Sequence, residues 1–231
     1  MKQFLLLLVF VFCLASCLNR AEREEKNISS ADDIFYDYQV WADEESEDVT
    51  VRLQFRRGDK DGDPFAVESP GKVLLDGEEL TADSARFTGV YYETAKPVDG
   101  FIGKHTVDFI DRSGKKHREE FSFKPFTLIR ELPEKIKKAP FQIQLQGFSQ
   151  SSMPVRLVMV DTSMASADVN EELWTKNGRL NITEAFLDNL TPGPVMLEIY
   201  SEVERPIRSD TTSSGRFSMT YGLKRQINLV K

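Results

Sequence analysis

Residues 104–123 have the sequence KHTVDFIDRSGKKHREEFSF, in which two alternating stretches flank a short polar turn. Val107 and Phe109 fall on one face of the first stretch, and Phe121 and Phe123 fall on the matching face of the second. The residues between them, DRSG, are of the types that turns favour. Alternation of apolar and polar residues on both sides of such a turn is typical of two antiparallel strands, so this segment predicts a β-hairpin.

Similar alternating stretches recur along the chain. In Val49 to Phe55 every second residue is apolar, which predicts a strand with one buried and one solvated face. Asp76-Gly77 is a strong signal for a hairpin turn. The other stretches expected to form strands are Ile34–Trp41, Lys72–Leu75, Arg86–Thr94, Thr127–Arg130, Phe141–Leu145, Val155–Val160, Gly178–Ile182, Val195–Tyr200 and Arg216–Tyr221.

Few segments favour any other structure. Asn170–Trp174 is expected to form a helical turn with Asn170 as its cap, and a second turn is expected within Thr183–Leu190. Ser201–Gly215 is expected to be an exposed loop, because Pro206 has no N–H to give to a strand ladder and the following residues are small or polar.

The strands divide into two groups at Lys124-Pro125, which predicts one domain over residues 33–125 and a second over residues 126–231. Residues 193–199 weakly repeat the pattern of residues 103–109, although two strands can share such a pattern by coincidence. Each group has about 100 residues, the usual size of an immunoglobulin-like sandwich. The mature chain resembles lipid-anchored proteins with tandem immunoglobulin-like modules, and Leu190–Leu197 resembles the corner that leads into one of their strands. The corner tyrosine of that family is replaced here by Met196 or Leu197.

The N-terminal residues indicate a signal peptide. Lys2 is followed by an apolar run from Phe4 to Ala15, which is shorter than the roughly 20 residues of a membrane-spanning helix. Small residues then precede Cys17 in the sequence Leu14-Ala15-Ser16-Cys17. The same residues are compatible with an ordinary secretory signal cut after Ser16, or with a short uncleaved anchor.

This stretch resembles the lipobox of bacterial lipoproteins. The resemblance implies cleavage of residues 1–16 between Ser16 and Cys17 and attachment of lipid to Cys17, which would hold the protein on a membrane. Residues 17–32 are polar, charged and without periodicity, which predicts a disordered tether. Glu22, Glu24 and Glu25 loosely resemble the export signal of surface lipoproteins of the Bacteroides group, and a plain solvated linker is the alternative.

Composition argues against several classes of function. Removal of Lys2 with the signal leaves 29 of the 30 basic residues against 37 acidic ones, a net charge of −8. Such a surface disfavours nucleic acid as a partner and gives no polybasic membrane patch. Cys13 leaves with the signal and Cys17 is expected to carry lipid. The folded part would then have no disulfide, thiol nucleophile or zinc–thiolate site.

No catalytic, cofactor or metal site is predicted. Asp59–Asp63 (DKDGD) resembles a calcium loop, but its glycine stands at position four and position twelve is Pro70, so a solvated turn is favoured. His105 and His117 are expected to be structural, because no acid stands near them in the pattern and they do not face each other across the hairpin. We therefore expect a protein that is not an enzyme.

Aromatic residues supply the one indication of a binding surface. Phe35 and Trp41 fall on the outward face of the first strand, and Tyr91 and Tyr92 follow later. An exposed row of rings can stack on sugars, whereas the alternative is that the rings are buried between sheets or domains.

Together these features predict an outer-membrane lipoprotein that faces the periplasm or the cell surface. Its expected role is non-catalytic binding or scaffolding with an envelope protein. A carbohydrate-binding lipoprotein of a glycan-uptake system is the alternative.

Overall fold

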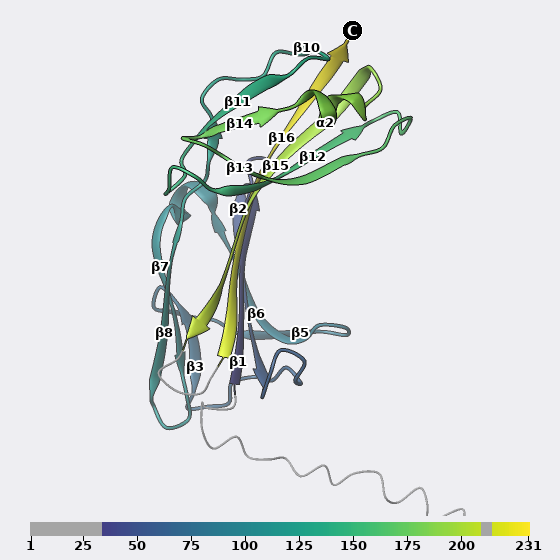
Figure 1. The fold of residues 1–231 in the computed structure, drawn as a ribbon. Coiled ribbons are helices and arrows are strands. Elements are labelled where there is room, and N and C mark those ends of the chain that lie inside the picture. Colours follow the sequence, from purple (N-terminus) through teal and green to yellow (C-terminus); the bar gives the residue numbers. More distant parts are fainter. Residues whose placement is uncertain (1–33, 209–213) are drawn as a thin grey trace, which may run out of the picture. The chain divides into compact units, whose positions relative to one another are not determined.

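The computed structural model describes residues 34–208 and 214–231, whose elements are labelled in Figure 1. The first half contains β1 (Ile34–Asp43), β2 (Asp48–Arg57), β3 (Lys72–Leu75), β4 (Glu78–Glu79), β5 (Ala82–Ala85), β6 (Gly89–Pro97), the 3-10 helix η2 (Val98–Phe101), β7 (Gly103–Ile110) and β8 (Lys116–Phe123). The second half contains β9 (Thr127–Leu128), β10 (Lys135–Lys137), β11 (Phe141–Gln146), β12 (Pro154–Asp161), β13 (Val169–Trp174), β14 (Arg179–Ile182), the helix α2 (Glu184–Asp188), β15 (Gly193–Arg208) and β16 (Ser214–Val230).

The described strands form three sheets. The largest has the order β13-β12-β15-β16-β1-β2-β6-β5, and β10 also pairs with β16. A four-stranded sheet has the order β4-β3-β7-β8, and a three-stranded sheet has the order β14-β11-β9. Neighbouring strands are antiparallel except at β16, which runs parallel to both β1 and β10.

The first sandwich packs the large sheet against the four-stranded sheet. The alternation predicted for β2 is confirmed, since Val49, Val51, Leu53 and Phe55 are all fully buried. The ring of Phe55 lies 5.1 Å from that of Phe109 on β7. Aromatic rings therefore join the two layers, and burial of such large side chains stabilises the packing.

The second sandwich packs the other end of the large sheet against the three-stranded sheet, which Figure 1 shows as a separate layer. Its core side chains are each no more than 2% exposed: Ile143, Leu145, Leu180 and Ile182 from the small sheet, and Leu157, Met159, Leu197 and Ile199 from the large one. The described chain is thus all-β with two sandwiches in tandem, as predicted.

The predicted hairpin is confirmed as β7–β8. His105 is the partner of Phe121 and Phe109 is the partner of His117 in the register. The turn is closed by Asp111, whose Oδ1 accepts hydrogen bonds from the backbone N–H groups of Ser113 and Lys115. Because the Asp111 side chain accepts the hydrogen bonds of the turn that it begins, the position of this turn can be predicted from the sequence.

The prediction of a loop over Ser201–Gly215 is wrong for every residue of it that the structure describes. β15 continues to Arg208, and Pro206 is the partner of Arg216 on β16. β12 pairs with β15 only as far as Tyr200, so Pro206 lies on an edge strand, where a missing N–H is tolerated. Residues 209–213 lie outside the described part.

The long β15–β16 hairpin enters both sandwiches. At the end away from its turn, residues 195–200 of β15 pair with β12 and residues 228–230 of β16 pair with β10, in the second sandwich. Nearer the turn, Ser214–Gly222 pair with β1 in the first sandwich. Strands that the sequence assigns to different domains, on either side of residue 125, are therefore neighbours in one sheet.

Two smaller predictions are also corrected. Asn170–Trp174 is not a helical turn but lies in strand β13, because pairing with β12 outweighs the helix propensity of its glutamates and leucine. Arg86–Thr88 form the turn before β6 rather than the start of a strand. The helical turn expected within Thr183–Leu190 is confirmed as α2, with Thr183 at its N-cap.

Candidate binding surface

The predicted lipidation and cleavage sites, Cys17 and Ser16, and the segments 1–16 and 17–32 lie outside the described residues. Within the described residues, no helix has the length and apolar character needed to span a membrane. Lipid attachment at Cys17 stays a prediction.

Three of the four aromatic residues predicted for binding lie on one face. Phe35 and Trp41 on β1 and Tyr91 on β6 are each half-buried and point away from the face that packs on β7. Tyr92 points the other way and is 4% exposed. Its hydroxyl accepts a hydrogen bond of 2.8 Å from the backbone N–H of Val67, and burial raises its pKa. Tyr92 is therefore a core residue rather than part of the surface.

Arg52 on β2 connects the two central rings of this face. Its guanidinium carbon lies 5.2 Å from the ring centre of Trp41 and 4.9 Å from that of Tyr91. The same guanidinium pairs with Glu93, the cross-strand neighbour of Arg52, at 2.6 Å. Cation–π contacts of this kind hold the rings in place, and they also cover part of the ring surface that a sugar would need. Sequence reasoning missed Arg52, although its outward parity in β2 was the available signal.

A polar half of the face lies beside these rings. Arg216 on β16 donates to Asp37 on β1 at 3.0 Å, and this hydrogen bond raises the pKa of Arg216. Gln39, between Asp37 and Trp41 on the same side of β1, is half-buried. We call the outward side chains Asp37, Gln39, Trp41, Arg52, Tyr91, Glu93 and Arg216 the aromatic–polar face.

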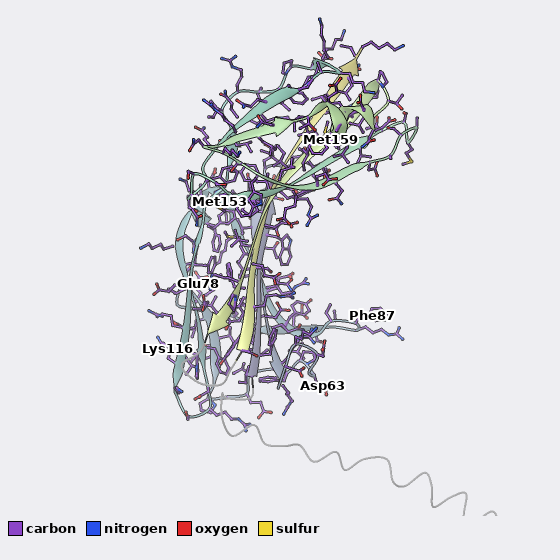
Figure 2. All side chains as sticks on the ribbon, in the orientation of Figure 1. Asp63, Glu78, Phe87, Lys116, Met153 and Met159 are labelled. Atoms are coloured by element: carbon purple, nitrogen blue, oxygen red, sulfur yellow. The ribbon has the colours of Figure 1, made fainter. Side chains whose placement is uncertain are left out.

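Phe87 stands at the tip of the β5–β6 hairpin beside this face and is 93% exposed. Figure 2 shows its side chain projecting away from the sheet. The root of the hairpin is held by Gln54, whose Nε2 donates to the carbonyl oxygens of Thr88 and Val90 at 2.7 and 2.9 Å. The buried amide of Gln54 thus fixes the base of a hairpin whose tip carries an exposed aromatic ring. The sequence does not predict this tip, because its pattern over residues 86–94 favours one continuous strand.

An acidic cluster lies further along the large sheet at Tyr200. The Tyr200 hydroxyl donates to Glu198, and burial together with Glu198, Asp43 and Glu202 raises the pKa of Tyr200 to about 12. The ring also lies against Gly222, where an added Cβ would meet it at 2.7 Å. The Tyr200 phenol therefore serves as a hydrogen-bond donor to an acidic neighbour on its own strand.

His105 has an acidic partner that the sequence pattern did not indicate. Its Nδ1 lies 2.7 Å from Oδ2 of Asp76, and its Nε2 lies 2.8 Å from the carbonyl oxygen of Phe101. The ring is stacked on that of Phe101 at 3.7 Å and is buried. Both nitrogens are therefore engaged within the fold, so the histidine–aspartate pair ties the Asp76 turn to β7 rather than facing a substrate.

His117 is half-buried against Tyr36 and Phe109, with its Nε2 3.6 Å from Asp111. In the part of the chain that the structure describes, no three His, Cys, Asp or Glu side chains are grouped so that they could hold a metal ion.

Comparison with protein families finds no match, and comparison with curated proteins finds none either. Among solved structures, the chain is similar to DIP-gamma IG1+IG2, with 8% identity and a TM-score of 0.24 over 82% of this chain and 94% of that one. It is also similar to Dpr11 IG1 bound to DIP-gamma IG+IG2, with 11% identity and a TM-score of 0.23 over 82% and 96%. A third likeness is to the Yersinia pseudotuberculosis adhesin InvE, with 13% identity and a TM-score of 0.22 over 83% and 59%.

Proposed function

We propose that this chain is a lipid-anchored cell-envelope protein with a non-catalytic binding or scaffolding role. Its place would be the outer membrane, facing the periplasm or the cell surface, with the lipid on Cys17 as its membrane contact. The lipobox-like residues support the anchor. The aromatic–polar face supports the binding role, and it is the single observation that carries the proposal, because half-buried rings and paired charges lie there on the side of the sheet opposite the core.

The anchor is tested by substitution of the cysteine. Cys17→Ser should abolish labelling of the protein by an alkyne fatty acid and leave the precursor uncut at this position. A mutant that is labelled and processed like the wild type would show that the lipobox interpretation is wrong.

The binding role is tested by capture from envelope extract. The double variant Trp41→Ala/Tyr91→Ala should lose an envelope partner that the wild type retains. A matched control, Phe87→Ala, removes an exposed ring outside the aromatic–polar face and should retain it. Equal capture by all three proteins would remove this face from the proposal.

Carbohydrate binding is the second candidate, favoured by the half-buried rings of Trp41 and Tyr91 and by the Glu93 carboxylate on the same face. A glycan array distinguishes it from protein binding. Because Arg52 covers part of both rings, Arg52→Ala should strengthen glycan binding if stacking is the mode of recognition, whereas Trp41→Ala should abolish it. A wild-type protein that binds no glycan on the array would exclude this candidate.

A further inference from the structure

The second sandwich ends in two open strand edges of opposite charge. In this part of the large sheet the order is β13-β12-β15-β16-β10, so β10 and β13 are its outermost strands. β10 carries Lys135 and Lys137, both exposed, whereas β13 carries Glu171 and Glu172, both exposed. An open edge presents unpaired backbone N–H and C=O groups to a further strand.

These four charges have no ion-pair partner among the described residues, unlike others on the same sheet. Arg156, which is opposite Glu172 in β12, pairs instead with Glu202 at 3.3 Å. Lys135 and Lys137 flank Ile136, which is 8% exposed, so both lysines point to the outer face of the sheet. Their charges are therefore available to a partner.

We propose that the β13 edge of one copy of this chain pairs with the β10 edge of a second copy, which extends the sheet head to tail. Strand direction agrees with this arrangement. β10 is parallel to β16, and β16, β15, β12 and β13 alternate in direction, so β10 and β13 run in opposite senses. A second copy in the same orientation therefore presents its β13 antiparallel to β10.

One antiparallel register matches every facing pair. It places Lys137 opposite Glu172 and Ile136 opposite Leu173. It also places Lys135 opposite Trp174, an indole that is 60% exposed at the end of β13. The pairs are an opposite-charge pair, an aliphatic pair and a cation–π pair, each of a kind that stabilises neighbouring strands.

The same charges select this pairing against others. Two β10 edges would oppose lysine to lysine, and two β13 edges would oppose glutamate to glutamate, which disfavours symmetric dimers. Unlike edges attract, and a head-to-tail contact between unlike surfaces leaves one free edge at each end, so it propagates. The contact is short, so the association is weak and sensitive to salt.

The test is sedimentation of the full chain in a nonionic detergent, in about 0.02 M and about 0.5 M salt, where the screening lengths differ severalfold. The wild type should form concentration-dependent oligomers in low salt and dissociate in high salt. A protein that is monomeric in low salt at all concentrations would overturn the proposal, and the edge charges would then serve only to prevent pairing.

Charge reversal supplies the decisive variants. Lys135→Glu/Lys137→Glu and Glu171→Lys/Glu172→Lys should each weaken self-association about tenfold or more, because both edges of each variant carry the same charge. A mixture of the two should restore association, because the acidic edges of the first variant attract the basic edges of the second. If either variant associates like the wild type, or if the mixture stays monomeric, the pairing is wrong.

The control for the lysine variant is Lys60→Glu/Lys115→Glu, which makes the same change in net charge as Lys135→Glu/Lys137→Glu at exposed positions of the first half and should leave association intact. Circular dichroism checks the fold of each variant. Lys135→Gln/Lys137→Gln replaces the reversal if that variant misfolds, and it should also weaken association.

Discussion

The β7–β8 and β15–β16 hairpins are both antiparallel ladders, yet only the first could be predicted from its own residues. β7–β8 is closed by a turn in which Asp111 accepts hydrogen bonds from the backbone that follows it, so the residues that specify this hairpin lie within the hairpin itself. β15–β16 owes its outer half to β1, which is paired with β16 across more than 170 residues of sequence. The difference shows that a strand stabilised by a partner distant in sequence can contain polar residues and a proline, and can therefore be predicted as a loop.

The largest expected effect is at the contact between the two hairpins. The ring of Phe217 on β16 lies 5.1 Å from that of Phe121 on β8, and Phe217 is 2% exposed. Phe217→Ala should cost about 3–5 kcal/mol of unfolding free energy, because it leaves a cavity between the layers. Denaturant unfolding measures this loss. A loss below about 1 kcal/mol would mean that the outer half of β16 is not part of the core.

The next effect is at the parallel pairing of β16 with β1. A Cβ on Gly215 would lie 2.6 Å from the carbonyl oxygen of Tyr36, so Gly215→Ala forces the two backbones apart. We expect a loss of about 1–3 kcal/mol, the usual cost of overpacking. Thermal unfolding is the measurement. Gly100→Ala is the control, because nothing lies within 4 Å of its added Cβ, and equal losses in both variants would contradict the close approach.

A third prediction concerns pH and the β7–β8 ladder. Arg118 donates to Asp108 at 2.7 Å, and this hydrogen bond holds the pKa of Asp108 below its usual value of 3.8. A depressed pKa in the folded state means that the pair stabilises the fold above pH 3.8 and that this contribution is lost as the pH falls through the folded value. Asp108→Asn should therefore be less stable than the wild type at pH 7, by about 1 kcal/mol or less, because the Arg118 guanidinium is half-exposed and water screens the pair.

The gap between Asp108→Asn and the wild type should close on acidification, which unfolding curves across the acid range will show. A gap that is the same at pH 7 and at the acid end would assign the loss to packing rather than to charge.

The smallest effect is expected at Pro206. Because β15 is an edge strand there, Pro206→Ala should change the unfolding free energy by no more than about 0.5 kcal/mol. A clear gain in stability would mean that a ladder hydrogen bond is missing at this position, and that Pro206 interrupts the strand after all.

The same contrast explains how much was predictable. Alternation in β2 and β12 and the Asp76 and Asp111 turns are local signals, and they indicated the all-β sandwiches. Within β15, Val203 and Ile207 alternate with Glu202 and Glu204 in the same way, but the acids and the proline favoured a loop. The secondary structure of such a segment is decided by the strands that it pairs with, and the residues of the segment do not identify those partners.

The candidate site shows the same division. Strand parity placed Phe35, Trp41 and Tyr91 on one face, but Tyr92 was included with them although its neighbour Tyr91 has the opposite parity. Arg52 and Arg216 come to the face from two further strands, β2 and β16, so only the sheet order brings them to the aromatic residues, whereas Glu93 follows Tyr91 on β6 with the same parity. The contact of His105 with Asp76 likewise depends on the pairing of β3 with β7.

The position of β1 in the large sheet has a mechanical consequence. β1 lies between β16 and β2 rather than at an edge, and the described chain begins at its first residue, Ile34. A pulling force that enters the protein at Ile34 along the strand loads both flanking ladders at once. Such a strand has to be sheared out of the sheet with many hydrogen bonds resisting together, whereas an edge strand pulled across its axis peels away one pair at a time.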